Sequence, residues 1–258
     1  MTDWVTYLEG FHSRSPGLIE SVLARCVAGD LTPYRWLTRA VSPGARLVLD
    51  VACGSGPVAK TLRAQPGQGA PVIVGVDVST AELQLAAATG ATPVLRADAA
   101  ALPFRPGSFD AVSCSMGLMV VSDLGAALGQ ICRVLRPGGV FVATVPSAVP
   151  LRRSDVRVLA PLTARLRSTP QFPAGGEMQG LVGALDDAGL RLLEDGRERF
   201  VFAVRDRADA SSLVRSLYLP GTSDKRRESA VEWLVDRIRD GDPVEVAIPI
   251  RRVVALRG

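Results

Sequence analysis

Residues 47–58 are Leu47-Val48-Leu49-Asp50-Val51-Ala52-Cys53-Gly54-Ser55-Gly56-Pro57-Val58, an apolar run that leads into an acid, a glycine turn and a proline. Successive apolar residues are typical of a strand buried on both faces of a parallel sheet. Gly54 and Gly56 allow positive φ and close approach of a ligand to the backbone, and Pro57 suits the first position of a helix. The stretch therefore predicts a strand, a glycine loop and a helix N-terminus that form a nucleotide-type ligand site.

Length and composition indicate a folded α/β protein. With 258 residues, 47% of them hydrophobic, the chain can bury a large core. No apolar run approaches the roughly 20 residues of a membrane span, and the N-terminus lacks the basic-then-apolar order of a signal peptide. The four cysteines form no C-x-x-C pair, which predicts reduced thiols in a cytoplasmic protein. His12 is the only histidine, which excludes a metal site built from several histidines, and we predict no metal.

The charge pattern does not favour a nucleic-acid partner. The net charge is only +4, whereas a stripe of Lys and Arg is expected of a nucleic-acid-binding face. The basic clusters are scattered and interleaved with acids, and we interpret them as solvated surfaces: Arg152-Arg153, Lys225-Arg226-Arg227 and Arg251-Arg252.

From residue 46 the chain alternates predicted strands with predicted helices. Strands are expected over residues 46–51, 72–76, 92–96, 109–114 and 140–145. Helices are expected between them over residues 57–65, 81–89 and 124–135, followed by a turn at Arg136-Pro137-Gly138-Gly139. Repeated units of this kind predict a doubly wound parallel sheet with right-handed crossovers.

After Pro146 the pattern is less regular. Two late strands, 190–204 and 244–256, can pair as an antiparallel hairpin at one edge of the sheet. Pro249 indicates a bulge or an edge position there. Helices are expected near residues 155–167, 180–188, 211–218 and 229–239.

Residues 1–40 precede the first strand and contain two of the three tryptophans and two of the three tyrosines. Their apolar spacing predicts a helix over about 17–28, and Pro33 can begin a short second helix. We interpret this segment as an N-terminal helical arm or lid over the site, with core packing as the alternative. The remaining residues, 41–258, are expected to form one domain.

The glycine loop alone does not identify its ligand. Residues 54–59 match G-x-G-x-x-A, and Asp77 follows Gly56 by 21 residues, where an acid can bind ribose hydroxyls. Asp50 is more informative, because a carboxylate beside the loop would repel a pyrophosphate but accept a cationic ligand without phosphate. S-adenosylmethionine is such a ligand. Asp98, after the third predicted strand, can accept from an adenine amino group, so three acids converge at one sheet edge.

These motifs resemble those of class I S-adenosylmethionine-dependent methyltransferases, in the branch similar to ubiquinone- and menaquinone-biosynthesis methyltransferases. The resemblance covers about residues 47–145. It implies a Rossmann-like, doubly wound, mostly parallel seven-stranded sheet with helices on both faces and an antiparallel edge hairpin. The motifs occur in family order: Leu49–Gly56, Val74–Ser79, Ala97–Ala99 with Leu102-Pro103-Phe104, Ser108–Val112 and Arg133–Gly139.

The resemblance also implies a role for each matching position near the loop. Asp50 and the backbone of Gly54 and Gly56 would hold the methionine part of the cofactor, with Ala52 beside them. Asp77 would bind both ribose hydroxyls. An ordinary helix cap is the alternative role for each acid.

The other matching positions follow the next strands. Val78 would lie against the adenine face, Asp98 would accept from the adenine amino group, and the Ala99 N–H would donate to the ring. Cys114 and Ser115 would line the cofactor through backbone atoms.

Methyl transfer from a sulfonium is an in-line displacement, to which a protein mainly contributes alignment and exclusion of water. A base is needed only when the acceptor must lose a proton. His12 is the candidate base, and Tyr7 or Tyr34 could orient the acceptor. The alternative is that His12 packs within the arm or lies on its surface.

The acceptor is expected to contact residues 1–40, 146–180 and 216–224, which surround the mouth of the site. Residues 115–121 lack the Asn/Asp-Pro-Pro-Tyr sequence typical of relatives that methylate nucleobase amines or glutamine amides. Their methionines suit either an apolar pocket wall or the core. We predict a small hydrophobic acceptor, a secondary metabolite or quinone-like compound. RNA or protein methylation and a non-catalytic S-adenosylmethionine-binding role are the alternatives.

Overall fold

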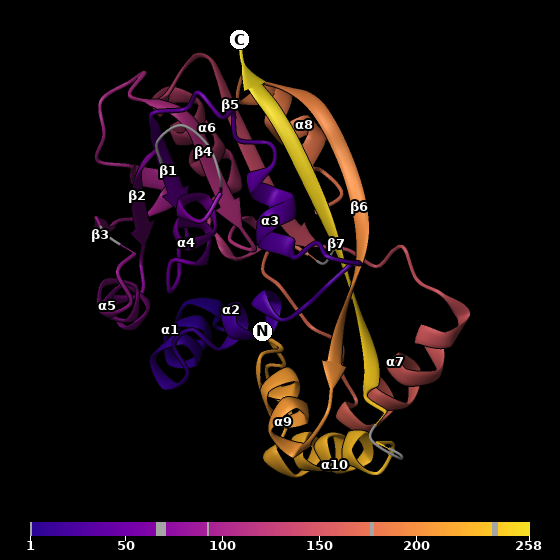
Figure 1. Cartoon of the computed structure of the whole chain (residues 1–258). Coiled ribbons are helices and arrows are strands. Elements are labelled where there is room, and N and C mark those ends of the chain that lie inside the picture. The colour runs from indigo at the N-terminus through magenta and orange to yellow at the C-terminus, as the bar shows by residue number, and fades with distance from the viewer. Residues whose placement is uncertain (1, 66–70, 92, 176–177, 239–241) are drawn as a thin grey trace.

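The computed structural model describes residues 2–65, 71–91, 93–175, 178–238 and 242–258. Within these ranges the strands form one seven-stranded sheet in the order β3-β2-β1-β4-β5-β7-β6 (Figure 1). Strands β1 to β5 pair in parallel, and β7 is antiparallel to both of its neighbours. The predicted doubly wound sheet with a late antiparallel pair is confirmed. Its strands are β1 (Leu47–Val51), β2 (Val72–Asp77), β3 (Val94–Arg96), β4 (Phe109–Ser115), β5 (Leu135–Pro146), β6 (Leu190–Val204) and β7 (Val244–Arg257).

Helices cover both faces of the sheet because side chains alternate between the faces along each strand. Val48 and Val142 point to one face, where they pack with α2, α3 and α4, while Leu49 and Phe141 point to the other, against α6 and α8. The α-helices are α1 (Trp4–Arg14), α2 (Leu18–Ala24), α3 (Pro33–Thr38), α4 (Pro57–Arg63), α5 (Thr80–Ala88), α6 (Leu124–Val134), α7 (Arg153–Leu166), α8 (Leu181–Asp187), α9 (Arg207–Arg215) and α10 (Asp224–Val235).

The β6–β7 pair extends beyond the rest of the sheet and supports a second layer of helices. It is paired from Leu190 with Arg257 to Val204 with Val244, whereas β5 accompanies β7 only as far as Ile250. The protruding ribbon packs against α7, α9 and α10 (Figure 1), and Phe200 contributes to their shared core.

Pro249 lies where β7 loses β5 as a neighbour, which confirms the predicted edge position. Ser147 N–H donates to the Pro249 carbonyl at 3.0 Å. Because the backbone groups of one strand residue point to the same side, the missing Pro249 N–H would also point toward the end of β5. The pairing of Arg199 with Pro249 therefore continues without a bulge.

One basic cluster is buried, so its interpretation as a solvated surface is wrong. Arg251 and Arg252 are only 4% and 8% exposed. Arg251 forms an ion pair with Asp195 on β6 at 2.7 Å, and Arg252 pairs with Glu194. Burial is tolerated because each guanidinium is compensated by a carboxylate of the neighbouring strand.

Several local elements also differ from expectation. The helix α1 was not anticipated as a separate element; Asp3 caps it by accepting from Thr6 N–H. The predicted turn at residues 136–139 belongs to β5, where the register shifts against β4 and Gly138 has a φ of 73°. Across the described residues, no helix has the length and apolar character required to cross a membrane.

Candidate functional site

Asp50 is buried at the carboxyl end of β1. It is 1% exposed and accepts a hydrogen bond from the Ser113 hydroxyl at 2.8 Å. Ser113 is its partner in the β1–β4 register. Its second carboxylate oxygen, Oδ2, has no hydrogen-bond partner among the described residues. Burial raises the pKa of Asp50 to about 7, since a carboxylate removed from water is costly without a compensating cation.

The glycine loop is tied to β2 through Asp77. Cys53 N–H donates to the Val76 carbonyl at 3.0 Å. Asp77, at the end of β2, accepts from Gly54 N–H and from Ser79 N–H, both at 2.9 Å. Burial nevertheless raises its pKa, because the two backbone donors compensate the charge only in part. Asp77 thus orders the loop and keeps lone pairs available to a ligand.

Gly56 ends the loop and begins α4. Its φ is 80°, and a Cβ there would lie 2.1 Å from the Ala91 side chain. Pro57 occupies the first helical turn, as the sequence predicts. Ala52 also has positive φ, at 53°. The tight path of the chain brings the backbone of the loop to the ends of β1 and β2.

The residues expected to contact adenine follow β2 and β3. Val78 is 59% exposed, an apolar side chain next to Asp77 with room for a flat partner. Asp98 is exposed and accepts from Ala100 N–H at 2.9 Å, while Ala99 is buried. Asp98 therefore caps a short 3₁₀ helix (η1, Ala99–Ala101). The helix cap is the alternative role considered for this acid, and the contact of Asp98 with adenine stays a prediction.

Cys114 and Ser115 end β4 beside the same edge. Cys114 is fully buried, backbone included, so its predicted contact with the cofactor stays a prediction. The Ser115 hydroxyl lies 3.3 Å from the Thr144 hydroxyl on β5. A Cβ at Gly117 would lie 2.5 Å from the Ala52 side chain, so the chain after β4 closely approaches the end of β1.

The N-terminal helices α1 and α2 lie across this edge (Figure 1) and are joined to it by His12. His12 Nδ1 is 2.9 Å from Glu82 Oε1, and His12 Nε2 is 2.8 Å from the Tyr218 hydroxyl. Gly17 N–H donates to the second oxygen of Glu82 at 2.9 Å. Burial lowers the pKa of His12, but the hydrogen bond and charge of Glu82 outweigh it, and the pKa lies above its usual value.

Two acids of this region were not identified as site residues from the sequence. Glu82 was interpreted only as an acid of a first helical turn, yet it is 1% exposed and binds His12. Glu20, on α2, accepts from the glycine-loop Ser55 N–H at 3.3 Å. No local pattern signals either contact, because both partners are distant in the chain.

Aromatic residues of three segments meet at Tyr218. Its ring lies 6.2 Å from Tyr7, 4.7 Å from Phe11 and 6.0 Å from Phe172, between ring centroids. Leu219 N–H donates to the Tyr7 hydroxyl at 2.9 Å. The segments 1–40, 146–180 and 216–224 therefore converge. Tyr34 is instead buried with the core residues.

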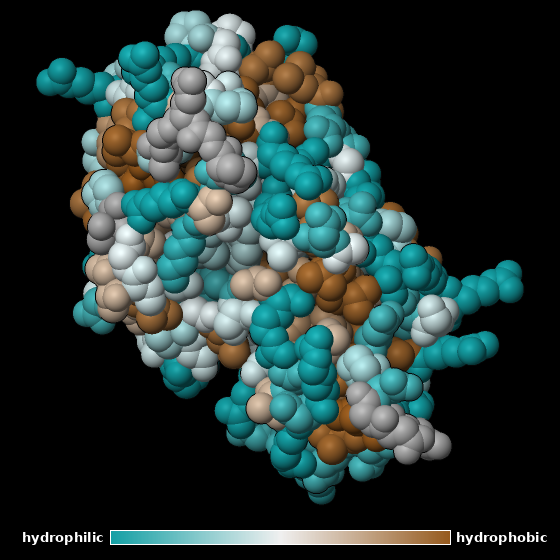
Figure 2. Space-filling view, viewed as in Figure 1, coloured by the Kyte–Doolittle hydropathy of each residue, from teal (hydrophilic) through white to brown (hydrophobic). Residues whose placement is uncertain are grey.

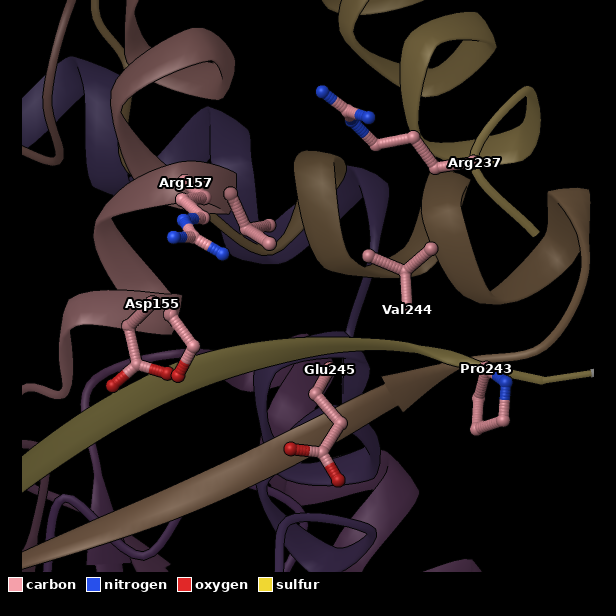
Figure 3. Close-up of a pocket in the computed structure, with 8 residues that line it drawn as sticks. Asp155, Arg157, Arg237, Pro243, Val244 and Glu245 are labelled. Atoms are coloured by element: carbon pink, nitrogen blue, oxygen red, sulfur yellow. The ribbon is translucent and has the colours of Figure 1, made fainter. Parts of the chain in front are cut away.

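Two surface grooves lie outside this site. One, of about 460 Å³, is formed between α7, the end of α10 and β7 (Figure 3). Its Asp155 accepts from Arg199 at 2.8 and 2.6 Å, which holds the pKa of Asp155 below its usual value. The other, of about 540 Å³, runs along β6. Figure 2 shows hydrophilic side chains over much of the part of the molecule formed by α7, α9, α10 and the protruding β6–β7 ribbon. The Arg199–Asp155 ion pair holds α7 to β6. Among the described residues that line the two grooves, no buried acid lacks a hydrogen-bond partner.

The comparisons with known proteins agree with this geometry. Residues 49–143 match the methyltransferase domain family. A demethylmenaquinone methyltransferase of Thermus thermophilus is 38% identical over 117 residues, 42% of this chain and 52% of that protein. One of Clavibacter sepedonicus is 36% identical over 143 residues, 51% of this chain and 57% of that protein. The chain therefore spans about half the length of these relatives.

Among solved structures, a [4+2]-cyclase named SpnF has a TM-score of 0.60 at 19% identity, covering 98% of this chain and 94% of that one. At this identity the likeness shows the shared fold alone. The fold therefore extends over nearly the whole chain, while the sequence likeness is concentrated in the segment that holds Asp50, Asp77 and the glycine loop.

Proposed function

We propose that this protein transfers a methyl group from S-adenosylmethionine to a small hydrophobic acceptor, because residues 49–143 match the methyltransferase domain family. The observation that carries the proposal is Asp50, a buried carboxylate with one unpartnered oxygen beside the glycine loop. A pyrophosphate would be repelled there. A ligand with ammonium and sulfonium groups would supply the positive charge that the acid lacks.

The chain's own residues would bind and align the cofactor. Asp50 and the loop backbone would face its methionine part, and Asp77, which holds the loop through Gly54, would face the ribose. S-adenosylmethionine supplies a methyl group already activated by the sulfonium. The arm, fastened through His12, would exclude water and fix the approach of the acceptor.

The aromatic cluster at Tyr218 supports a hydrophobic acceptor. Tyr7, Phe11 and Phe172 come from two segments outside the matched domain and enclose Tyr218. Met116, at the end of β4, packs against the hydrophobic residues of both faces of the sheet. Aromatic rings and a methionine favour a flat apolar ligand. The relatives named demethylmenaquinone methyltransferases make a reduced quinone ring the first candidate.

His12 is the proposed base for acceptors that must lose a proton. Its bond to Glu82 orients the ring, and its other nitrogen contacts Tyr218. The raised pKa favours the imidazolium, in which both nitrogens donate. The fraction of His12 able to accept a proton would therefore increase as pH rises through its pKa. The acceptor would also have to replace Tyr218 as the hydrogen-bond partner of His12 Nε2.

Binding is tested by calorimetry with S-adenosylmethionine and NAD. We expect binding of the first only; the reverse preference would replace the proposal with a dehydrogenase. Acceptor class is tested by mass spectrometry after incubation with labelled S-adenosylmethionine and reduced benzoquinones or naphthoquinones, bulk RNA or protein. Label in the quinol supports the proposal, and label in RNA or protein rejects its acceptor. Binding without transfer to any class would favour the non-catalytic S-adenosylmethionine-binding role.

A further inference from the structure

We propose that Glu20 on α2 is a cofactor-binding residue that receives the α-ammonium group of S-adenosylmethionine, so that the N-terminal arm forms part of the cofactor site. The inference rests on the function proposed above. It adds a residue outside the segment that matches the methyltransferase domain, residues 49–143.

The first observation is position. Glu20 Oε1 accepts from Ser55 N–H at 3.3 Å, within the glycine loop. A Cβ built on Gly54 would lie 1.8 Å from the same oxygen. The carboxylate therefore lies directly on the bare backbone of Gly54, the surface that the methionine part of the cofactor is expected to contact.

The second observation is an incomplete set of partners. Glu20 Oε2 is buried without a hydrogen-bond partner in the described part of the chain, and the same holds for Asp50 Oδ2. The other oxygen of each acid accepts one hydrogen bond, from Ser55 N–H for Glu20 and from the Ser113 hydroxyl for Asp50. A buried carboxylate oxygen without a donor is costly, and a hydrogen-bonding cation would compensate both acids.

The third observation is charge. Burial and the neighbouring Glu82 raise the pKa of Glu20 to about 7. The charges of Glu20, Asp50 and Asp77 all raise the pKa of the Cys53 thiol, which places the three acids around one loop. His12 lowers the pKa of Glu20, but its Nδ1 is already bonded to Glu82. The acids thus exceed the positive charge available to them.

The ammonium group fits this demand better than the sulfonium. A sulfonium carries charge but no N–H donor, whereas an ammonium carries three donors. One ammonium has enough donors for the free oxygens of both acids, which come from two different elements, α2 and β1. The arm would then be held over the site by the cofactor as well as by His12.

Calorimetry with two ligands separates this role from general support of the loop. S-adenosylhomocysteine retains the ammonium, and 5′-methylthioadenosine lacks the whole amino-acid part. Glu20→Gln keeps the size of the side chain and an oxygen that can accept from Ser55. Glu9→Gln removes an exposed acid from the same arm and is the matched control.

We expect Glu20→Gln to weaken S-adenosylhomocysteine binding roughly 10- to 100-fold, the range for a hydrogen bond to a charged group. Binding of 5′-methylthioadenosine should change less than about twofold, and Glu9→Gln should change neither. Thermal unfolding of Glu20→Gln without ligand should be unchanged or higher, because a buried charge is removed.

Other results overturn the inference. Unchanged S-adenosylhomocysteine binding by Glu20→Gln would remove Glu20 from the site. Equal losses for both ligands would assign it to fastening the loop, and tighter binding would make it an obstruction. If the unaltered protein binds neither ligand, the proposed function fails with it, whereas each of the other outcomes leaves that function standing.

Discussion

Asp50 and Asp110 lie on the neighbouring strands β1 and β4, near opposite ends of the sheet, and they have opposite electrostatic surroundings. Asp110 accepts from Arg46 N–H at 2.8 Å and Leu47 N–H at 2.9 Å, and pairs with Arg136. These partners outweigh its slight burial and lower its pKa. In the described part of the chain, Asp50 accepts a side-chain hydrogen bond from the Ser113 hydroxyl alone, and burial raises its pKa to about 7.

The difference distinguishes an acid with a structural role, Asp110, from an acid with the features of a ligand-binding residue, Asp50. Asp110 fixes the start of β1 and the register shift of β5 through groups within the chain. Asp50 is placed by the same sheet but leaves one oxygen without a partner in the described residues. A buried charge left uncompensated is a cost that a structural role does not explain, and it indicates a binding function.

The strongest test of this contrast is Asp50→Asn. The amide can still accept from Ser113, but the negative charge is lost. We expect S-adenosylmethionine binding to weaken about 100-fold, the cost of removing one partner of a buried charged contact, with no loss of stability in the absence of cofactor. Calorimetry measures the affinity, and Asp110→Asn serves as the control. Equal affinities of Asp50→Asn and the unaltered protein would reduce Asp50 to a structural residue.

The converse test is Asp110→Ala. Two backbone N–H groups and Arg136 lose their acceptor, and we expect a loss of about 2 kcal/mol in the free energy of unfolding. Urea denaturation without cofactor measures it. Cofactor affinity of the folded fraction should be unchanged. A variant as stable as the unaltered protein would show that water replaces Asp110 without cost.

Stability should depend on pH with opposite sign for the two acids. Because the folded pKa of Asp50 is raised from 3.8 to about 7, its contribution to stability falls as pH rises through that window. The lowered pKa of Asp110 gives stability that is lost only as pH falls below its usual 3.8. At pH 6 a carboxylate with a pKa near 7 is only about one-tenth ionised. Each such carboxylate should therefore weaken the binding of a cationic cofactor about tenfold relative to the fully ionised protein at higher pH.

Thermal unfolding between pH 5.5 and 8, with and without S-adenosylmethionine, measures this dependence. The stabilisation by cofactor should increase with pH, and calorimetry in buffers of different ionisation enthalpy should detect proton release on binding. The Asp50→Asn variant should show a smaller pH dependence. A stabilisation that is the same at every pH would mean that the buried acids stay ionised throughout.

The sequence predicts the central sheet well because its signals are local. Strand and helix positions from 47 to 145 follow from apolar runs, Pro57 and the glycines, and β6 is predicted at its observed bounds. The positions of Asp50 and Asp77 at strand ends follow in the same way. Residues 136–139 are the exception, since their glycines suggest a turn, whereas they lie within β5 at the register shift between the pairs Phe109–Leu135 and Ala111–Val140.

The arm could not be predicted to the same depth. Its contacts join residues that are far apart in the chain: Glu20 and Ser55 are separated by 35 positions, and His12 and Tyr218 by 206. Glu82 has the spacing of an ordinary first-turn acid, and its burial comes from the packing of α1 and of Gly17 on α5. Long-range burial, rather than residue type, distinguishes these acids from solvated ones.

Substitution of Asp98 should cause the smallest loss of cofactor affinity. It tests whether the contribution of each acid to binding depends on its burial. It is exposed and caps Ala100 N–H, so water competes for any contact with adenine. Asp98→Asn keeps both an acceptor and the cap, and should weaken S-adenosylmethionine binding no more than about threefold, whereas Asp98→Ala should weaken it about tenfold or less. Calorimetry on both variants beside Asp50→Asn would order the acids by their exposure. A 100-fold loss in Asp98→Asn would show instead that charge at the adenine end matters as much as charge beside the glycine loop.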